Sequence, residues 1–290
     1  MEIMNVSFIG LGVMGYPMAG YLQKNRLNVD VFNRTISKAQ KWSNEYGGNY
    51  FNTPGDAVKN AEIVFICVGR DEDLKEVMEG QNGILENSKK NAIIVDHTTA
   101  SANIAREYAD KCFKNDKHFL DAPVSGGQAG AENGQLSIMV GGDYIAFNKV
   151  KPLLAHYGKA IELIGESGSG QLTKMINQIC IAGLVQGLSE AMAFGKKSQL
   201  DMEKVLKVIS KGAAQSWQME NRYKTMLDGK FDYGFAVDWM RKDLSYCFDE
   251  AKKNNSNLPI TKIVDQFYKQ IQENGGNRLD TSSLMTLVDN

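Results

Sequence analysis

Short apolar runs, rich in β-branched and aromatic residues, alternate with amphipathic segments along the first 164 residues of the chain. This alternation is typical of a mainly parallel β-sheet whose strands are joined by crossover helices. We predict seven short strands: Asn5–Ile9, Val29–Phe32, Ile63–Val68, Ala92–Asp96, Phe119–Asp121, Ser137–Val140 and Ile161–Ile164.

Two of the intervening segments carry helix-start signals that do not depend on periodicity. Ser37 is followed three residues later by Gln40, which resembles a capping box. Thr53-Pro54 combines a capping residue with a proline suited to the first helical position. Both patterns predict that a helix begins there.

The pattern changes after the glycine-rich segment 165–170, where the β-rich runs stop and helical segments continue to the end. A chain of 290 residues is also long enough for about two domains, each with its own core. We therefore predict an α/β domain over residues 1–164 and an all-α domain over residues 165–290.

The first helical segment after this boundary is predicted to span residues 169–197 and to join the two domains. Only three strongly polar residues stand between Ile179 and Gly195, which predicts a helix buried on nearly every face. Gly183 and Gly187 each cost about 1 kcal/mol relative to alanine within a helix. Their presence predicts that another backbone packs closely against this stretch.

Composition narrows the classes of partner. The chain is 43% hydrophobic and 23% charged, as in a globular protein, and its net charge of -1 offers no broad attraction to nucleic acid or anionic membranes. The four cysteines are widely spaced without a CxxC pair, so we expect reduced thiols and no metal site. The amino terminus shows no secretion signal and no apolar run reaches the ~20 residues of a membrane span, which predicts a cytoplasmic protein acting on small molecules.

A glycine-rich turn follows the first predicted strand. Gly10, Gly12 and Gly15 form a G-x-G-x-x-G pattern at the start of a helix expected to run to about Asn25. Here Gly10 permits the tight turn, Gly12 lets a pyrophosphate approach the backbone, and Gly15 lets helix and strand pack closely. The alternative is a turn without a ligand. The dinucleotide reading makes Gly10, Leu11, Gly12, Val13, Met14 and Gly15 cofactor contacts.

The end of the second strand bears on which dinucleotide binds. An Asp or Glu that would accept from the ribose 2′-hydroxyl is absent, and Asn33, Arg34 and Thr35 stand there instead. Arg34 can pair with a phosphate, so a 2′-phosphate would be stabilised and NADP favoured over NAD. The alternative is that Arg34 is an ordinary solvated side chain and either cofactor binds.

Ligands of open α/β sheets bind beyond the carboxyl ends of the strands. Val68 and Gly69 follow the third strand, and Thr98 follows the fourth, so all three are candidate cofactor contacts. His97 is a possible base, but a lone histidine at a loop start is more often structural, and Thr98 is the preferred contact.

Two further segments are candidates for binding and transforming a substrate. After the fifth strand, the Ser125 hydroxyl and the backbone N–H groups of Gly126 and Gly127 can converge on a carboxylate, although a plain surface turn is the alternative. On the long helix, Lys174, Asn177 and Gln178 share one face at i, i+3 and i+4.

Lys174 is the candidate acid/base. Most helical lysines are merely solvated, but this one begins a helix that soon becomes apolar all round, and desolvation there would favour proton exchange. In the helical half, Lys242-Asp243 would by itself be a surface charge pair.

Four motifs in this order resemble those of the β-hydroxyacid dehydrogenase family, which includes 3-hydroxyisobutyrate dehydrogenases, tartronate semialdehyde reductases and glyoxylate/succinic semialdehyde reductases. The resemblance covers essentially the whole chain. Its motifs are Gly10-x-Gly12-x-Met14-Gly15-x-x-Met18, Asp121-Ala122-Pro123-Val124-Ser125-Gly126-Gly127, Gly170-x-x-x-Lys174-x-x-Asn177 and Lys242-Asp243-Leu244.

The resemblance implies a Rossmann domain followed by an all-helical domain, with the active site in the cleft between them. It implies that Ser125, Gly126 and Gly127 hold a substrate carboxylate, that Lys174 is the essential acid/base, and that Lys242 closes the site. Asn177 would orient the substrate, and Gln178 is a further candidate for direct substrate contact. Many members have Asn-Asn where this chain has Asn177-Gln178, so which of the two residues supports the chemistry stays open. Members are usually dimers or tetramers, which implies a homo-oligomer.

The expected reaction is reversible hydride transfer between NAD(P) and a small semialdehyde acid or 3-hydroxy acid. Decarboxylation in the manner of 6-phosphogluconate dehydrogenase is a rival, but the His-Asn pair of that family is missing after Lys174. Imine reductases are a second rival, and these usually lack the helix lysine. A dinucleotide-binding sensor or scaffold without turnover is the rival from another class.

Overall fold

The computed structural model describes residues 4–289. The chain divides into two compact units, one up to Lys174 and one from Met175 onward, so that the division falls inside one long helix. We describe each unit by itself. The domain boundary near residue 165 stays a prediction.

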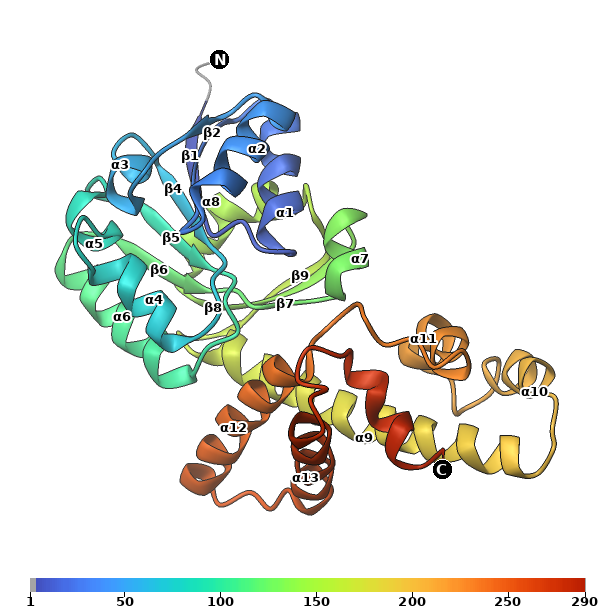
Figure 1. The fold of residues 1–290 in the computed structure, drawn as a ribbon. Helices are drawn as coiled ribbons and strands as arrows, with labels where there is room; N and C mark the ends of the chain where they lie inside the picture. Colours follow the sequence, from blue (N-terminus) through green and yellow to red (C-terminus); the bar gives the residue numbers. More distant parts are fainter. Residues whose placement is uncertain (1–3, 290) are drawn as a thin grey trace. The chain divides into compact units, whose positions relative to one another are not determined.

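The first unit contains one nine-stranded sheet (Figure 1). Its strand order is β3-β2-β1-β4-β5-β6-β8-β7, with β9 beside β8. Strands β1 to β6 pair in parallel and β8 runs antiparallel to β6, which confirms a mainly parallel sheet. The bounds are β1 Asn5–Ile9, β2 Asn28–Phe32, β3 Asn49–Tyr50, β4 Ile63–Ile66, β5 Ile93–Asp96, β6 His118–Asp121, β7 Val124–Ser125, β8 Leu136–Gly142 and β9 Gly158–Gly165.

All seven predicted strands are present, with ends that differ by a few residues. The two-residue strands β3 and β7 were not predicted, because a pair of residues is too short to show periodicity. The helices of this unit are α1 Gly15–Lys24, α2 Ile36–Tyr46, α3 Pro54–Val58, α4 Asp71–Glu79, α5 Ile84–Asn87, α6 Ala102–Lys114, α7 Gly127–Glu132 and α8 Tyr144–Leu154.

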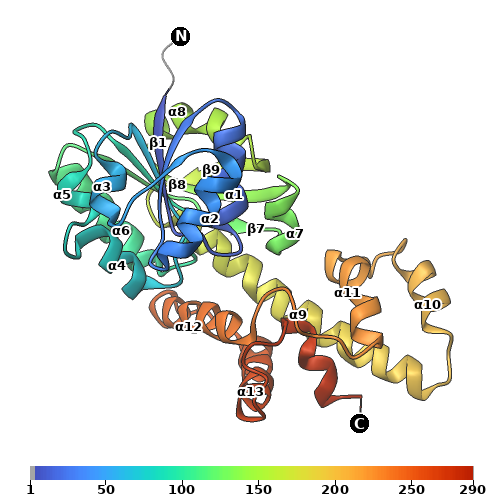
Figure 2. The ribbon, with the colours of Figure 1, turned by 45° about the horizontal axis from the view of Figure 1, so that its top comes forward.

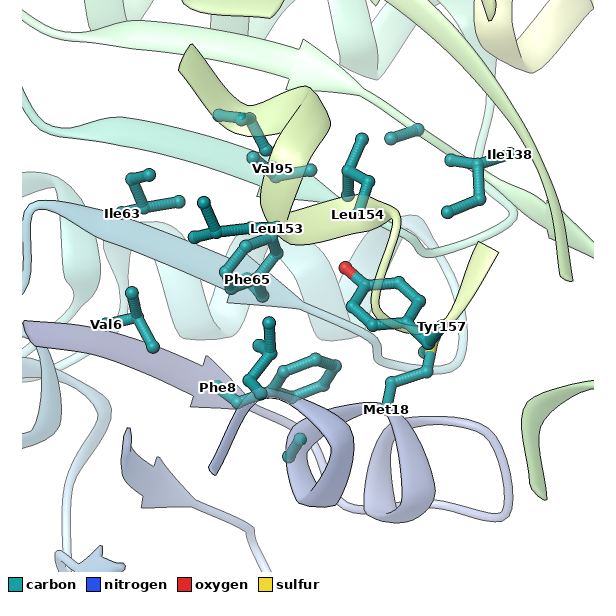
Figure 3. Packing of buried hydrophobic residues seen from close by; sticks show 14 of the residues in the cluster. Val6, Phe8, Met18, Ile63, Phe65, Val95, Ile138, Leu153, Leu154 and Tyr157 are labelled. Carbon is teal, nitrogen blue, oxygen red and sulfur yellow. The ribbon is translucent and has the colours of Figure 1, made fainter. Parts of the chain in front are cut away.

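Apolar side chains on both faces of the central strands build two cores. Successive residues of a strand point to opposite faces, so Phe65 joins the core that also holds Met18 of α1 and Leu153 of α8, whereas Ile66 joins the core that holds Tyr108 of α6. Figure 3 shows the first of these cores from close by. A sheet covered on both faces has near-continuous apolar strands, which is why the sequence runs were easy to find.

The two predicted helix starts have different outcomes. The Thr53 hydroxyl accepts a hydrogen bond from the Asp56 N–H at 3.1 Å, and Pro54 opens α3, as predicted. The capping box at Ser37 is wrong, because α2 begins at Ile36 after Thr35 and has no side-chain cap.

Helix α9 spans Ser169–Lys197, as predicted, but one of its faces is open. The side chains of Ile176 and Phe194 are 63% and 73% exposed, so the prediction of burial on nearly every face is wrong for this face. A Cβ built on Gly183 or Gly187 would meet no atom of the chain within 4 Å. The predicted close backbone contact is therefore absent among residues 4–289.

The second unit is helical, as predicted. After the α9 residues from Met175 onward it contains α10 Met202–Ile209, α11 Trp217–Leu227, α12 Val237–Asn254, α13 Pro259–Glu273 and the 3-10 helix η1 Thr281–Leu287. Figures 1 and 2 show α10 and α11 beside the carboxyl-terminal end of α9. Five methionines contribute to the core formed there: Met192, Met202, Met219, Met226 and Met285. Within the described part of the chain, no helix combines the length and the apolar character needed to cross a bilayer.

Candidate functional site

The glycine-rich turn after β1 has the backbone geometry that the sequence predicts. Gly10 has a φ of 98°, and a Cβ there would lie 2.2 Å from the Cys67 carbonyl oxygen. A Cβ on Gly15, the first residue of α1, would lie 2.0 Å from the Gly10 carbonyl oxygen. Both glycines are thus fixed by neighbouring backbone.

Gly12 differs from these two glycines, because a Cβ built on it would meet nothing within 4 Å. Its backbone is open to an approaching group at the amino end of α1, and the neighbouring Val13 side chain is exposed. Leu11, by contrast, is buried, and Met14 packs against the core. A turn that exposes N–H groups at a helix amino end fits the pyrophosphate of a dinucleotide.

Asn33 closes this turn from the end of β2. Its side-chain oxygen accepts from the Leu11 N–H at 2.8 Å, and its amide nitrogen donates to the Thr35 carbonyl at 3.0 Å. The side chain of Arg34 is 80% exposed and forms an ion pair with Asp73 of α4 at 3.1 Å. Arg34 therefore stands in solvent beside the turn, already paired with a carboxylate.

The loops that follow β4 and β5 are tied together by Thr98. Its hydroxyl accepts from the Val68 N–H at 3.0 Å, and its own N–H donates to Asp96 at 2.9 Å. Thr98 is buried, and its hydrogen bond with Val68 fixes the loop that contains Val68 and Gly69. Burial raises the pKa of Asp96 to about 7, although the Thr98 hydrogen bonds lower it.

His97 is a structural residue. Its ring nitrogens lie 2.6 Å from the Ala122 carbonyl oxygen and 2.8 Å from the Tyr157 hydroxyl, and the ring stacks on Phe65. Burial lowers the pKa of His97 to about 4, which keeps the ring neutral. These contacts favour the structural interpretation over a catalytic base.

Asp121, the last residue of β6, anchors the start of α9. Its two carboxylate oxygens accept from the N–H groups of Gly168 at 2.7 Å and Gln171 at 2.9 Å, which satisfies donors that a helix start leaves unpaired. Burial raises the pKa of this carboxyl, while these N–H groups lower it. A Cβ on Gly170 would lie 2.4 Å from the Met139 carbonyl oxygen, so the helix start sits directly on the sheet backbone.

Gln171 connects this helix start to the Thr98 loop. Its side-chain oxygen accepts from the Ala100 N–H at 3.1 Å, and its amide nitrogen donates to the Thr98 carbonyl at 2.7 Å. Lys174 stands three residues further along the helix and is only 7% exposed. The candidate acid/base therefore lies in a turn of helix that is fixed to the ends of β5 and β6.

The candidate carboxylate-binding segment lies at the junction of β7 and α7. Ser125 pairs with Ser137 of β8, while Gly126 and Gly127 both have positive φ, of 139° and 62°. A Cβ on Gly127 would meet nothing within 4 Å, so its backbone is open. These backbone angles favour glycine at both positions.

The remaining predicted residues lie in the second unit and form one polar network. The Asn177 amide nitrogen donates to the Gln178 oxygen at 2.8 Å, and the Gln178 nitrogen donates to Asp243 at 2.6 Å. Asp243 also forms an ion pair with Lys242 at 3.1 Å. The Lys242 ammonium lies 5.5 Å from the Trp239 ring centroid and 5.4 Å from that of Tyr246.

Comparison with known families decides the class of protein. Residues 5–165 match the model described as the NAD-binding domain of 6-phosphogluconate dehydrogenase, and residues 168–288 match that described as the NAD-binding region of NADP-dependent 3-hydroxyisobutyrate dehydrogenase. The chain belongs to the β-hydroxyacid dehydrogenase family. This dehydrogenase is therefore an NAD(P)-binding oxidoreductase with a Rossmann domain and a helical domain.

Individual relatives agree with this family. An uncharacterised oxidoreductase of Shewanella frigidimarina is 57% identical over 98% of both chains. The 2-hydroxy-3-oxopropionate reductase of Escherichia coli is 35% identical over 99% of this dehydrogenase and 97% of its own length. A solved 3-hydroxyisobutyrate dehydrogenase of Salmonella typhimurium is 25% identical, with a TM-score of 0.88 over 98% of this chain and 99% of that one.

Sequence reasoning assigned no part to Asp121, Gln171 or Asp243, although all three hold candidate site residues in place. A signal for Asp121 exists in the sequence, because a carboxylate that directly ends an apolar strand needs partners once it is buried. Gln171 has a similar signal as a polar residue at the start of an apolar helix. Asp243 is part of the Lys242-Asp243-Leu244 motif, but it is buried rather than in a surface pair, and nothing local predicts its contact with Gln178, which lies 65 residues away.

Proposed function

We propose that this dehydrogenase reduces a small carboxylate-bearing aldehyde to the hydroxy acid, and catalyses the reverse oxidation, with Lys174 as general acid/base. The observation that carries the proposal is the fixed position of Lys174. This buried amine follows Gln171 by one helical turn, and Gln171 is hydrogen-bonded to the loop after β5 at the carboxyl edge of the parallel strands.

The residues after the strands fit a nicotinamide dinucleotide. We propose that Gly10, Leu11, Gly12, Val13, Met14 and Gly15 hold its pyrophosphate, and that Val68, Gly69, Thr98 and Lys242 also contact it. The open backbone at Gly12 supports this assignment. When bound, the nicotinamide ring exchanges a hydride with the carbonyl carbon of the substrate.

The chain's own groups supply orientation and the proton. Ser125, Gly126 and Gly127 would bind the substrate carboxylate, and Asn177 and Lys242 would orient the substrate. As an ammonium, Lys174 would donate a proton to the carbonyl oxygen during reduction, and as a neutral amine it would take that proton back during oxidation. The open backbone of Gly127 supports an anion there.

We further propose that NADP is preferred and that NAD can also bind. Arg34 and Thr35 stand at the end of β2, with Asn33 engaged in closing the glycine turn. Because Arg34 already pairs with the carboxylate of Asp73, a 2′-phosphate would replace one anion by another and leave the guanidinium paired. Cytoplasmic location stays a prediction.

The test of the reaction compares Lys174→Ala with Lys197→Ala, an exposed lysine at the other end of the same helix. Reduction is followed by nicotinamide absorbance with glyoxylate, succinic semialdehyde, tartronate semialdehyde and methylmalonate semialdehyde. Lys174→Ala should lower turnover by about 10²–10⁴-fold, the usual worth of acid/base catalysis, and leave the cofactor Kd unchanged. Lys197→Ala should match the wild type.

Two results would count against the proposal. Retained turnover in Lys174→Ala, with weakened cofactor binding, would remove the acid/base assignment. Cofactor binding by the wild type without turnover of any of the four aldehydes would favour the sensor or scaffold instead.

We also propose a homodimer or homotetramer. Seven unburied positions follow one another at helical spacing on α9, namely Ile176, Cys180, Gly183, Leu184, Gly187, Ala191 and Phe194. Along the sequence, Ile176 and Phe194 are equally distant from Val185, and so are Gly183 and Gly187, so these positions are symmetric about Val185. A second copy whose α9 crosses this helix antiparallel at the glycines would therefore cover this apolar face with its own identical face. A monomer in sedimentation equilibrium at micromolar concentration would contradict this.

A further inference from the structure

Gln178 stands where many family members have asparagine, and its side chain is fully engaged inside the second unit. It is 2% exposed and reaches from α9 to Asp243 of α12, which is also 2% exposed. The bond between the Gln178 nitrogen and Asp243 is 2.6 Å long. An asparagine at position 178 is one methylene shorter and would not reach across without a movement of α12.

The network also dictates which way each amide faces. A carboxylate paired with Lys242 only accepts hydrogen bonds, so Gln178 must turn its nitrogen toward Asp243. Its oxygen then faces Asn177, and only the amide nitrogen of Asn177 can satisfy it. The orientation of the Asn177 amide therefore follows from a charge on another helix.

Fixing the nitrogen of Asn177 also fixes its oxygen, because the two atoms of a planar amide point apart. Asn177 thus turns its oxygen, an acceptor, away from Gln178. An acceptor suits a partner that carries a proton, such as an ammonium or a hydroxyl group. A flipped amide would present N–H groups instead.

We propose that Gln178 and Asp243 are positioning residues that fix the orientation of the Asn177 amide, the group proposed to orient the substrate. This inference rests on the proposed function and deepens it. It gives Gln178 an indirect part, through Asn177, in place of the direct substrate contact predicted from the sequence.

Lys242 completes the arrangement. Its ammonium is held by Asp243 at 3.1 Å and lies over two aromatic rings of the same helix. Removing the carboxylate of Asp243 should therefore affect Lys242 and Gln178 together.

The test exchanges donor and acceptor between positions 178 and 243. In Gln178→Glu two carboxylates would face each other, and in Asp243→Asn the Gln178 amide loses its orienting charge. In the double variant, Asn at position 243 can donate to Glu at position 178, which still offers an oxygen to Asn177. The measurements are kcat, KM and cofactor Kd with tartronate semialdehyde and NADPH, and the Tm of each variant.

We expect each single variant to lose about 10²-fold in kcat, a loss that misplacing a substrate by about 1 Å can cause. The cofactor Kd should stay unchanged in Gln178→Glu, whereas it should change in Asp243→Asn, because Lys242 loses its ion-pair partner there. The double variant should recover most of this kcat and most of any loss in Tm. Gln186→Leu is the matched control, because Gln186 is a buried glutamine on the same helix that donates to a carboxylate, that of Glu190, at 2.7 Å. Its kcat should equal that of the wild type.

Wild-type kcat in both single variants, or a double variant no better than the worse single one in both kcat and Tm, would overturn the proposal. Lys174→Ala is measured alongside and separates the two proposals. If it keeps its turnover, the acid/base role fails, whereas recovery in the double variant would still establish the orientation of Asn177. The Tm values report the contact between the two positions independently of turnover.

Discussion

The loops after the parallel strands and the polar network of α9 and α12 are built in different ways. In the loops, the glycine turn is set by backbone contacts, such as that between Gly10 and the Cys67 carbonyl. In the network, side chains 65 residues apart meet, as Gln178 and Asp243 do. A short motif can therefore encode the first region, whereas the second exists only once two helices have packed.

The sharpest test of this comparison substitutes two glycines of the same turn. Gly10→Ala puts a Cβ on the Cys67 carbonyl at a φ of 98°, so it should lower the free energy of unfolding by about 2–3 kcal/mol and weaken cofactor binding as well. Gly12→Ala has room in the chain, so it should keep the stability and raise the cofactor Kd by about 10–100-fold.

Chemical denaturation and titration of the cofactor fluorescence give the two quantities. Equal stability of both variants would mean that the turn adapts and that backbone contacts do not set its geometry. An unchanged cofactor Kd in Gly12→Ala would move the pyrophosphate away from this turn.

Most of the fold could be predicted because burial on both faces makes each strand an uninterrupted apolar run, as in Ile63–Ile66. The ends of α9 could be predicted because glycines precede it and polar residues follow it. The open face of α9 could not, because apolar residues such as Ile176 and Phe194 look the same in a sequence whether the chain itself or another molecule covers them.

The candidate site divides in the same way. Residues that follow a strand directly, such as Gly10 and Thr98, could be placed from the strand pattern alone. The contacts of Gln171 with the Thr98 loop and of Asp121 with the start of α9 could not, because they join segments about 50 to 70 residues apart through single side chains. Sequence spacing put Lys174 and Asn177 on one helix face but said nothing of what orients them.

Asp96 provides a second test. It lies in the first region, but, as in the network of the second region, its buried carboxylate holds neighbouring residues through side-chain hydrogen bonds. Burial raises the pKa of Asp96 to about 7, well above the ordinary value of about 3.9 that it has in the unfolded chain. Between about pH 3.9 and pH 7, Asp96 is protonated in the folded protein and ionised in the unfolded chain. A rise in pH across this range therefore favours unfolding. This group should lower the stability by at most about 1.4 kcal/mol per pH unit across the window.

Asp96→Asn removes this titration and keeps the side-chain oxygen that accepts from the Thr98 N–H. Thermal unfolding from pH 4 to 7 should therefore show a shallower fall in Tm for the variant than for the wild type. Parallel curves for the two proteins would mean that Asp96 is ionised throughout, with the loop network compensating its burial.

The smallest expected effect concerns Arg34, whose exposed side chain belongs to neither kind of region. Arg34→Gln should raise the Kd for NADP by about tenfold, since one charge-assisted hydrogen bond in solvent is lost, and should leave the Kd for NAD unchanged. Asp73→Asn should do the opposite and tighten NADP slightly, because it removes the carboxylate that competes for the guanidinium.

Lys41→Gln, an exposed change further along α2, is the control for lost positive charge. If it weakens NADP as much as Arg34→Gln does, the effect is a general one of net charge, and the end of β2 does not select the cofactor. If Arg34→Gln alone acts and only on NADP, a single solvated side chain next to a backbone-built turn decides which dinucleotide is preferred. The preference for NADP over NAD could then be changed by substituting Arg34 without disturbing the fold.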